Sequence, residues 1–280
     1  MINSRFLNVG CGLRFSRDPR WKNIDLFSTA PDVEPVNVAA GLPYPDATFD
    51  AVYHSHVLEH FDPEAGHVFL QECQRILKPG GVLRVVVPDL EQIARAYLSQ
   101  LVAAQCGEPG AERRYQWAVL EMFDQMVRRS AGGRMRTFLA DRETFGRAYA
   151  ISRCGAEVKG IITQLDAPEP AVSSTREPFS FRLVARKLRR SALRFFLRSE
   201  ASAFAEGQFF QTGEVHRWMY DIHSLGQLLK LVGFTEIVRR QAAESAIMDW
   251  HTFSLDTEPT GLPHKPDSLF MEARRHFDEH

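Results

Sequence analysis

The segment Val82–Val87 constrains the fold of this 280-residue chain more than any other. Five of its six residues are apolar, and only Arg84 interrupts the run. A strand that is apolar at nearly every position must be covered on both faces, which is typical of a central strand in a parallel sheet. Pro88 ends the run, because proline donates no hydrogen bond to a sheet ladder. The sequence therefore predicts an α/β fold built around this strand.

The first ninety residues alternate short β-type runs with turn signals, as expected of parallel strands joined by crossover connections. The predicted strands of this part are Phe6–Val9, Lys22–Leu26, Pro35–Val38, Ala51–Ser55 and Val82–Val87. Helical spacing of apolar residues predicts a helix over Glu64–Leu77, which ends before Lys78-Pro79-Gly80-Gly81. The last third returns to this pattern, and its predicted elements are a helix over Ser224–Val232 and strands over Glu236–Arg240 and Ser268–Ala273.

Residues 91–215 show helical spacing and no convincing strand. One apolar stripe consists of Ile93, Ala94, Tyr97, Leu98 and Leu101, and a second consists of Trp117, Leu120, Met122, Phe123 and Met126. This region carries 19 basic and 14 acidic residues, so the middle of the chain is basic and its flanks are acidic. We expect residues 1–90 and 216–280 to form the α/β core, and residues 91–215 to form a mainly helical insertion.

The composition excludes several classes of protein. Apolar residues make up 44% and charged residues 25%, as in soluble globular proteins, and no run approaches the roughly 18 apolar residues of a membrane-spanning helix. The N-terminus lacks the basic and apolar stretches of a targeting signal, so we expect a cytoplasmic protein. Four scattered cysteines form no C-x-x-C pair, which argues for reduced thiols. A net charge of −1 and the lack of a recognisable motif argue against a nucleic-acid partner.

The sharpest motif is LNVGCG at Leu7–Gly12, where an apolar strand runs into Gly10-x-Gly12. Glycines there let the backbone bend tightly and approach a ligand closely. The next strand ends at Asp25, where a carboxylate accepts hydrogen bonds from both hydroxyls of a ribose. A dinucleotide is disfavoured, because Phe15 stands where a third small residue would admit a pyrophosphate. Only thirteen positions separate Gly12 from Asp25, so the first crossover helix must be short or missing.

Four segments together resemble the class I S-adenosylmethionine-dependent methyltransferases. They are LNVGCG, NIDL, LPYPDATFDAVYHSHVLEH and ECQRILKPGGVLRVVVPD, in the order expected of that class. Within it the chain is similar to the small methyltransferases of type 11 that act in cell-envelope and glycan biosynthesis. The resemblance covers about residues 1–90 and 216–280. It implies a Rossmann-like sheet of seven mostly parallel strands whose last strand is antiparallel, with residues 91–215 as an insertion that caps the acceptor site.

The resemblance also implies a set of cofactor-binding residues for S-adenosylmethionine. Gly10, Cys11 and Gly12 fall against the methionine portion, Asp25 at the ribose and Asn37 at the adenine. The complete expected set is Val9, Gly10, Cys11, Gly12, Asp25, Leu26, Asn37 and His54. Arg14 replaces the third glycine of the family motif, which leaves the partner of the methionine carboxylate open. Its candidates are Arg14, Arg17 and Arg20, unless these residues form only a solvated basic loop.

Three histidines stand at the predicted end of the fourth strand, in His54-Ser55-His56 and at His60. His56 is the candidate general base, because histidine accepts protons near neutral pH. His60 is the candidate acceptor-binding residue, with packing at a helix start as its structural alternative. The spacing His56-x-x-Glu59-His60 also matches an inverted zinc-protease signature, but no protease context supports it, and we expect no metal.

Two further segments are candidates for binding the acceptor. In His216-Arg217-Trp218-Met219-Tyr220-Asp221 we assign His216, Trp218 and Tyr220 to the acceptor, with a helix entry capped by Asp221 as the alternative. The segment Phe181 to Arg198 predicts a basic amphipathic helix. It would contact an anionic membrane or a phosphate-bearing, lipid-linked acceptor, unless it is an ordinary surface helix.

These observations predict an S-adenosylmethionine-dependent methyltransferase that acts on an oxygen, or less readily a nitrogen, of a small-molecule or glycan-type acceptor. One alternative is a methyltransferase of a membrane-associated lipid or quinone precursor. Another is a non-catalytic S-adenosylmethionine-binding protein whose insertion serves as an interaction module. The identity of the acceptor and the oligomeric state do not follow from the sequence.

Overall fold

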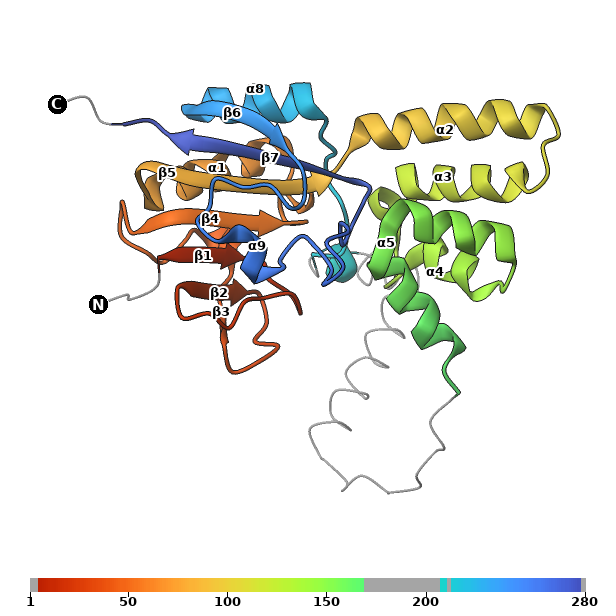
Figure 1. The fold of residues 1–280 in the computed structure, drawn as a ribbon, viewed down its shortest axis with the longest axis horizontal. Coiled ribbons are helices and arrows are strands. Elements are labelled where there is room, and N and C mark those ends of the chain that lie inside the picture. The colour runs from red at the N-terminus through yellow and green to blue at the C-terminus, as the bar shows by residue number, and fades with distance from the viewer. Residues whose placement is uncertain (1–4, 169–206, 211–212, 278–280) are drawn as a thin grey trace, which may run out of the picture.

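The computed structural model describes residues 5–168, 207–210 and 213–277, and these contain one seven-stranded sheet (Figure 1). The strands are β1 (Phe6–Val9), β2 (Trp21–Asp25), β3 (Val33–Pro35), β4 (Phe49–Ser55), β5 (Leu77–Pro88), β6 (Phe234–Arg240) and β7 (Ser268–Arg275). Their order is β3-β2-β1-β4-β5-β7-β6. Strand β7 is antiparallel to β5 and β6, and the other pairs are parallel. The predicted Rossmann-like sheet with an antiparallel last strand is confirmed.

Strand β5 is longer than the sequence predicted. It begins at Leu77, directly after the helix, whereas the predicted strand begins at Val82. Leu77 pairs with Phe49 and Val82 with Ala51, so the extra residues of this stretch lie in a bulge between the two pairs. A Cβ atom on Gly81 would lie 2.8 Å from the Lys78 carbonyl oxygen, which explains why glycine is needed in the bulge.

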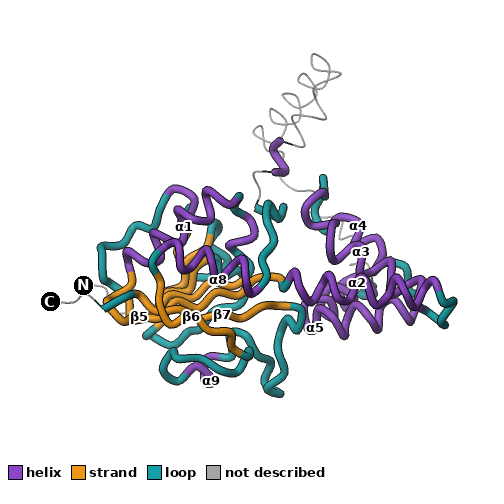
Figure 2. Tube along the Cα trace, turned by 90° about the horizontal axis from the view of Figure 1, so that it is seen from above, coloured by secondary structure: helices purple, strands orange, loops and turns teal. Residues whose placement is uncertain are grey.

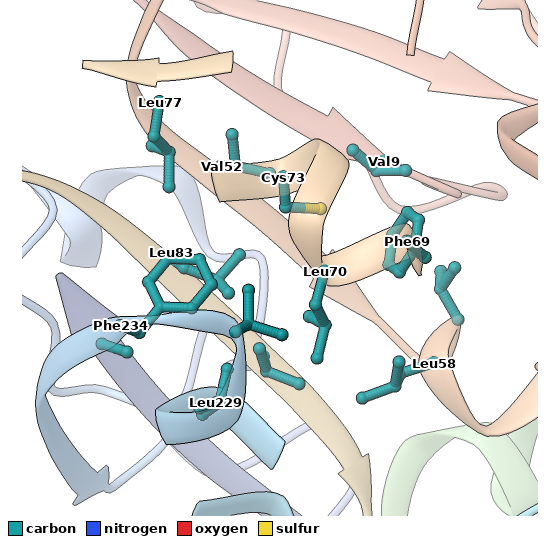
Figure 3. Close-up of a cluster of buried hydrophobic side chains, with 14 of the residues drawn as sticks. Val9, Val52, Leu58, Phe69, Leu70, Cys73, Leu77, Leu83, Leu229 and Phe234 are labelled. Carbon is teal, nitrogen blue, oxygen red and sulfur yellow. The ribbon is translucent and has the colours of Figure 1, made fainter. Parts of the chain in front are cut away.

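One face of the sheet is covered by helices α1 (Pro63–Ile76) and α8 (Ile222–Val232). Each begins at an aspartate, because the carboxylates of Asp62 and Asp221 accept hydrogen bonds from the first-turn amides of Ala65 and Ser224. The helices bury apolar side chains against the inward-facing positions of the strands (Figure 3). This face forms the larger apolar core of the protein.

The opposite face is covered without a long helix. Residues 10–20 between β1 and β2 form no helix, as the sequence predicted. Residues 241–267 cross this face instead and contain only the short helix α9 (Trp250–Phe253), which Figure 2 shows on the side of the sheet away from α1. An aromatic cluster joins this segment to the strands and includes Phe6, Trp21, Tyr53, Trp250 and Phe253.

A buried ion network also holds the 241–267 segment to the sheet. The Arg84 side chain is fully buried, and it donates hydrogen bonds to Asp256 Oδ2 at 2.8 Å and to Glu272 Oε1 at 2.9 Å. The same guanidinium donates to the backbone carbonyls of residues 241, 242 and 244 and lies 4.5 Å from the Trp250 ring centroid. Tyr53 donates a 2.6 Å hydrogen bond to the other oxygen of Asp256. The one charge inside the central apolar strand is therefore the anchor of a distant segment.

Four helices extend beyond the carboxyl ends of the parallel strands (Figure 1). They are α2 (Leu90–Gln105), α3 (Ala111–Val127), α4 (Gly133–Ala140) and α5 (Thr144–Asp166). A small core of their own surrounds the buried Trp117. The two predicted apolar stripes are only partly buried, because Leu98 of α2 and Phe123 of α3 are more than half exposed. Among the described residues no helix is long and apolar enough to cross a membrane.

Candidate active site

The bend after β1 brings together the two elements that the sequence singled out. Gly10 and Gly12 have φ angles of 63° and 54°, a left-handed conformation that glycine adopts without strain. A Cβ atom on Gly10 would overlap with Val57 Cγ2, so no larger residue fits there. The Gly12 amide donates a hydrogen bond of 2.8 Å to Asp25 Oδ2. The glycine bend and the carboxylate at the end of β2 thus form one structural unit.

Two cavities open at the carboxyl ends of the strands, and both are lined by Gly10 and His56. The larger, of about 630 Å³, is called the Asp25 cavity, and its other lining residues include Asp25, Leu26, Asn37 and His60. The smaller, of about 380 Å³, is called the Lys265 cavity, and its other lining residues include Cys11, Gly12, Glu157 and Lys265. A ligand that passes over Gly10 can therefore reach both cavities.

Two of the expected cofactor-binding residues lie away from these cavities. Val9 and His54 are fully buried on the face that α1 covers, and the His54 ring contacts Phe69 with 5.1 Å between centroids. Side chains at successive positions of a strand point to opposite faces of the sheet. Val9, next to Gly10, and His54, next to Ser55, therefore point into the core and not toward the cavities at the strand ends. Burial lowers the pKa of His54 to about 4. The expectation that His54 lines the cofactor pocket does not match its position.

Asn37 and Cys11 face the cavities from opposite sides of the glycine bend. Asn37 Oδ1 accepts a hydrogen bond from the Ala39 amide and caps the short 3-10 helix η1 (Val38–Ala40). No described residue accepts a hydrogen bond from the Asn37 side-chain nitrogen, which is therefore available to a ligand in the Asp25 cavity. Burial raises the pKa of the Cys11 thiol to about 12, so this residue contributes an uncharged wall to the Lys265 cavity.

His56 stands on the wall between the two cavities. Its φ angle of 55° is unusual for a residue other than glycine, and its backbone amide donates to the Val86 carbonyl oxygen at 2.9 Å. The ring is held at both nitrogens: Nδ1 lies 3.0 Å from Glu59 Oε1, and Nε2 lies 3.0 Å from Ser268 Oγ. A strained backbone that fixes a polar side chain is frequent at functional sites.

Glu59 is the most deeply buried acid of the site. Its side chain has no exposed surface, and burial by itself raises the pKa of the carboxyl. The interaction with His56 outweighs burial and holds the Glu59 pKa well below its usual range, with smaller contributions from His216 and His60. The Glu59 backbone carbonyl also accepts hydrogen bonds from the amides of Arg217 and Trp218, which fixes the 215–218 segment against the end of β4.

The predicted acceptor-binding residues occupy different environments. His60 lines the Asp25 cavity, and its ring lies 4.9 Å from the ring of the buried His216. Burial lowers the pKa of His216 to about 3. Tyr220 is buried in the core under α8, and Trp218 is about half exposed and lines neither of the two cavities. The structure brings His60 and His216 together with Glu59 and leaves Trp218 and Tyr220 apart.

Several residues of the Lys265 cavity were not predicted from the sequence. Helix α5 breaks at Gly155, where a Cβ atom would lie 2.6 Å from the His264 carbonyl oxygen, and this close approach brings Glu157 to the cavity. Lys265 Nζ lies 2.8 Å from Glu157 Oε2. Burial lowers the pKa of Lys265, but the Glu157 carboxylate more than compensates and raises it overall, so the lysine is charged. No local motif marks these residues, because they come from a helix and a loop over 100 positions apart.

The three arginines that could have paired with a methionine carboxylate are engaged elsewhere. Arg14 lines the Lys265 cavity, but its guanidinium donates to the backbone carbonyls of residues 254, 255 and 257 and to Glu258. Arg20 is held by Asp18 and Asp249. Arg17 is largely exposed and lies 3.5 Å from Asp32. Lys265 is paired with Glu157, but its ammonium group has three N–H donors, so it is the better candidate for an anionic ligand group.

The predicted basic amphipathic helix from Phe181 to Arg198 lies outside the described residues, and its contact with a membrane stays a prediction. All four cysteines are free, as expected. The proposed role of residues 91–215 as an acceptor cap also stays a prediction, although Glu157 of α5 and Phe210 do line the two cavities.

The strand order and the glycine bend place the protein in a definite class, that of Rossmann-like α/β domains, in which ligands bind at the carboxyl ends of the strands. A family model described as "Methyltransferase domain" matches residues 23–85, from β2 into β5. A probable S-adenosylmethionine-dependent methyltransferase of Mycolicibacterium smegmatis is 46% identical over 50 residues, which is 18% of this chain and 19% of that protein. The probable methyltransferase ltbC of Aspergillus luteorubrus is 46% identical over 48 residues, 17% of each chain.

Residues 23–85 thus resemble a methyltransferase domain, as the sequence motifs predicted. The chain spans less than a fifth of the length of either curated relative. A solved S-adenosylmethionine-dependent methyltransferase from Archaeoglobus fulgidus aligns with a TM-score of 0.37 and 11% identity, over 98% of this chain and 87% of that one. Because this TM-score is low, the fold assignment rests on the strand order.

The residues of the two cavities fit the cofactor that this class implies. Asp25 Oδ1 is left facing the Asp25 cavity, apart from a long hydrogen bond of 3.3 Å from the Phe27 amide, and it can accept from ribose hydroxyls. Leu26 and Val38 supply apolar surface for a base, and the free nitrogen of Asn37 can donate to it. Lys265 supplies a positive charge in the neighbouring cavity. The donor set therefore matches an adenosyl group joined to a charged amino-acid tail.

Proposed function

We propose that the protein transfers a methyl group from S-adenosylmethionine to an oxygen of a small-molecule or glycan-type acceptor. The observation that carries this proposal is the meeting of the two cavities at Gly10 and His56, with Asp25 in one and Lys265 in the other. In this arrangement Asp25 holds the ribose, Asn37 and Leu26 contact the adenine, and Lys265 pairs with the methionine carboxylate.

Positioning is the main contribution that the chain makes to such a reaction. The bound cofactor supplies a methyl group on a positively charged sulfur, which is electrophilic without further activation. A displacement at carbon needs the acceptor oxygen, the methyl carbon and the leaving sulfur in line, and fixing that geometry can lower a barrier by about 7–11 kcal/mol. The backbone around the proposed site of methyl transfer is rigid, because the Gly10 bend and the strained backbone of His56 are both fixed by hydrogen bonds to neighbouring strands.

His56 is the proposed proton acceptor for the acceptor hydroxyl. Its ring lies where both cavities meet, with Glu59 at Nδ1 and Ser268 at Nε2. To take a proton from the acceptor, Nε2 must exchange the Ser268 hydroxyl for the acceptor oxygen. The buried Glu59 carboxylate then stabilises the charged imidazole, as the carboxylate does in other acid–base pairs of this kind.

The acceptor is expected to enter through the Asp25 cavity. Phe61 and Phe210 offer aromatic surface there, and Arg217 offers a positive charge. Aromatic faces with polar groups between them suit a sugar or another ring that carries hydroxyls. His60 lies on the same wall and His216 directly behind it, so both can act on the acceptor side.

The first test measures cofactor binding by titration calorimetry. We expect Asp25→Ala to weaken S-adenosylmethionine binding by about 100-fold or more, because two hydrogen bonds to a charged group contribute roughly 1.5–3 kcal/mol each. Asp32→Ala is the matched control, since among the described residues Asp32 pairs only with the exposed Arg17, and this substitution should leave affinity within about twofold. Unchanged binding by folded Asp25→Ala protein would contradict the assignment of the ribose site.

The second test separates binding from transfer. We expect His56→Asn to slow release of S-adenosylhomocysteine by about 100-fold in a screen of hydroxylated acceptors, the usual contribution of a general base, while cofactor affinity stays within about threefold. An equal loss of affinity and rate would remove His56 from the proposed role. A wild-type protein that binds the cofactor but turns over no acceptor would favour the non-catalytic binding protein instead.

A further inference from the structure

Three potential metal ligands converge beside the Asp25 cavity. Glu59, His60 and His216 each offer one ligand atom, and these atoms lie within 4.8 Å of one another. Glu59 and His60 belong to the 3-10 helix η2 (Leu58–His60) after β4, whereas His216 comes from the segment before α8. Backbone hydrogen bonds from Arg217 and Trp218 to the Glu59 carbonyl fix the two segments against each other. The cluster is therefore preorganised rather than formed by flexible side chains.

Glu59 provides an independent indication of a ligand. Its side chain is fully buried, and neither carboxylate oxygen accepts a hydrogen bond of good geometry from a described residue. His56 Nδ1 lies 3.0 Å and His216 Nε2 lies 4.0 Å from Oε1. A buried carboxylate without adequate partners costs several kcal/mol, so such groups in proteins pair with cations or bind metals. Glu59 points into the cluster with this requirement unmet.

The histidine tautomer also suits a metal ligand. His60 Nδ1 lies 3.2 Å from the Val215 carbonyl oxygen, to which it can only donate, so the tautomer that makes this hydrogen bond carries its lone pair on Nε2. Metal-binding histidines commonly donate their second N–H to a backbone carbonyl in this way. His56 Nδ1 lies 3.0 Å from Glu59 Oε1, and a polar neighbour is also usual beside a ligating acid.

We propose that Glu59, His60 and His216 bind one divalent first-row transition metal ion. Two imidazoles and one carboxylate suit Zn²⁺, Mn²⁺ or Fe²⁺, whereas Mg²⁺ prefers oxygen ligands. Three protein ligands leave coordination positions of the metal open. Because His60 lines the Asp25 cavity, these open positions are expected on the wall of that cavity. On the basis of the proposed function, an acceptor hydroxyl that occupies an open position loses its proton more readily and becomes a better nucleophile. This site replaces the expectation of no metal.

A second cluster in the described residues provides the contrast. Glu121, Cys154 and Asp267 also lie within ligand distance of one another. Glu121, however, already accepts two hydrogen bonds from Arg153, at 2.5 and 3.2 Å, so its charge is neutralised. Burial raises the pKa of the Cys154 thiol far above its ordinary value, which disfavours the ligating thiolate. This cluster is not proposed as a metal site and serves as the internal control.

The experiment uses the untagged full chain, freed of metal by chelation and titrated with Zn²⁺ in a calorimeter, with Co²⁺ absorption as a second readout. We expect one equivalent to bind, with visible Co²⁺ bands of a site that contains nitrogen ligands. Glu59→Gln and His216→Ala should each weaken binding by more than about tenfold, since even a residue that only supports a ligand has that effect. His60→Asn, on the cavity wall, is the substitution least disruptive to folding. Glu121→Gln and Cys154→Ser should leave affinity and spectrum unchanged.

Two results would overturn the metal site. One is the absence of stoichiometric binding by folded wild-type protein, which would leave His56 as the partner of Glu59. The other is binding that survives all three ligand substitutions and disappears in Cys154→Ser. Cofactor titrations of the same samples keep the two proposals separate. Metal binding without S-adenosylmethionine binding would contradict the proposed function alone, and the reverse result would contradict the metal site alone.

Discussion

The two faces of the sheet are covered in different ways. Helices α1 and α8 cover one face with apolar side chains such as Leu70 and Leu229, both fully buried (Figure 3). The 241–267 segment covers the other with aromatic rings and the buried ion network of Arg84. The first face is stabilised by burial of apolar area, and this stabilisation depends little on the orientation of the contacting side chains. The second is stabilised by contacts of fixed geometry between residues far apart in the sequence.

This difference teaches how a sheet tolerates the loss of a crossover helix. The short connection between β1 and β2 leaves the strand surface around Phe6 and Trp21 uncovered by its own neighbours. A chain segment without regular structure carries many backbone carbonyls that need donors. Arg84 and Arg14 satisfy several of them, at residues 241–244 and 254–257 respectively. Arginine thus takes over the role that the internal hydrogen bonds of a helix would have.

The largest effect is expected from Arg84→Met, which breaks the ion network. The substitution removes the main partner of Asp256 and one partner of Glu272, and uncompensated buried charge costs about 3–5 kcal/mol. Urea unfolding should show this loss, and amide hydrogen exchange should speed up in residues 241–257 first. Tyr53→Phe is the control within the network, because it removes one hydrogen bond and should cost only about 1 kcal/mol. Equal effects of the two substitutions would contradict the central role of Arg84.

A somewhat smaller effect is expected from Leu229→Ala on the helix-covered face. The side chain is fully buried, and truncating a core leucine costs roughly 3 kcal/mol through lost burial and the cavity left behind. Leu231→Ala is a matched control in the same helix, since Leu231 is 74% exposed. Its free energy of unfolding should change by less than about 0.5 kcal/mol. In Leu229→Ala protein, amide hydrogen exchange in residues 241–267 should speed up only through global unfolding. This result would sharpen the contrast with Arg84→Met.

The smallest expected effect is a pH dependence of the free energy of unfolding that arises from His54 on the helix-covered face. Burial lowers the pKa of His54 from 6.5 to about 4 in the folded protein, so the unfolded chain binds a proton more tightly. The stability that this group contributes is complete above pH 6.5 and is lost as the pH falls toward 4, by at most about 3 kcal/mol. In His54→Leu protein, urea unfolding between pH 7 and 4.5 should therefore depend less steeply on pH. An unchanged slope would show that another group causes the dependence.

The sequence predicted the parts of the fold that repeat locally. Strand β1, helix α1, helix α8 and the antiparallel β7 were found within a few residues, because apolar spacing, capping residues and Gly233 act over a single turn or strand. The missing first helix was also predicted, from the short spacing between Gly12 and Asp25. The covering of the second face was not, since nothing in residues 241–267 shows a periodic pattern.

The residues of the candidate site also fall into those that a local motif predicts and those that it does not. The glycine bend, Asp25, Leu26 and Asn37 carry a local motif, and the structure places them around one cavity. His54 lies away from that cavity, because the alternation of side chains along β4 turns its ring toward Phe69 of α1. Lys265 and Glu157 could not be predicted, because their meeting depends on the break at Gly155 and on the tertiary path of the C-terminal loop.

The hydrogen bonds from Arg14 to residues 254–258 have a consequence for folding during synthesis. The glycine bend near the N-terminus is braced by carbonyls that the ribosome adds some 240 residues later. An emerging chain can form β1 and β2 early, but the pocket floor stays unsupported until residues 254–258 have been made. Ligand capture would then report only on molecules that contain this segment, and fragments that end before residue 254 should fail to retain the nucleoside even when their strands are in place.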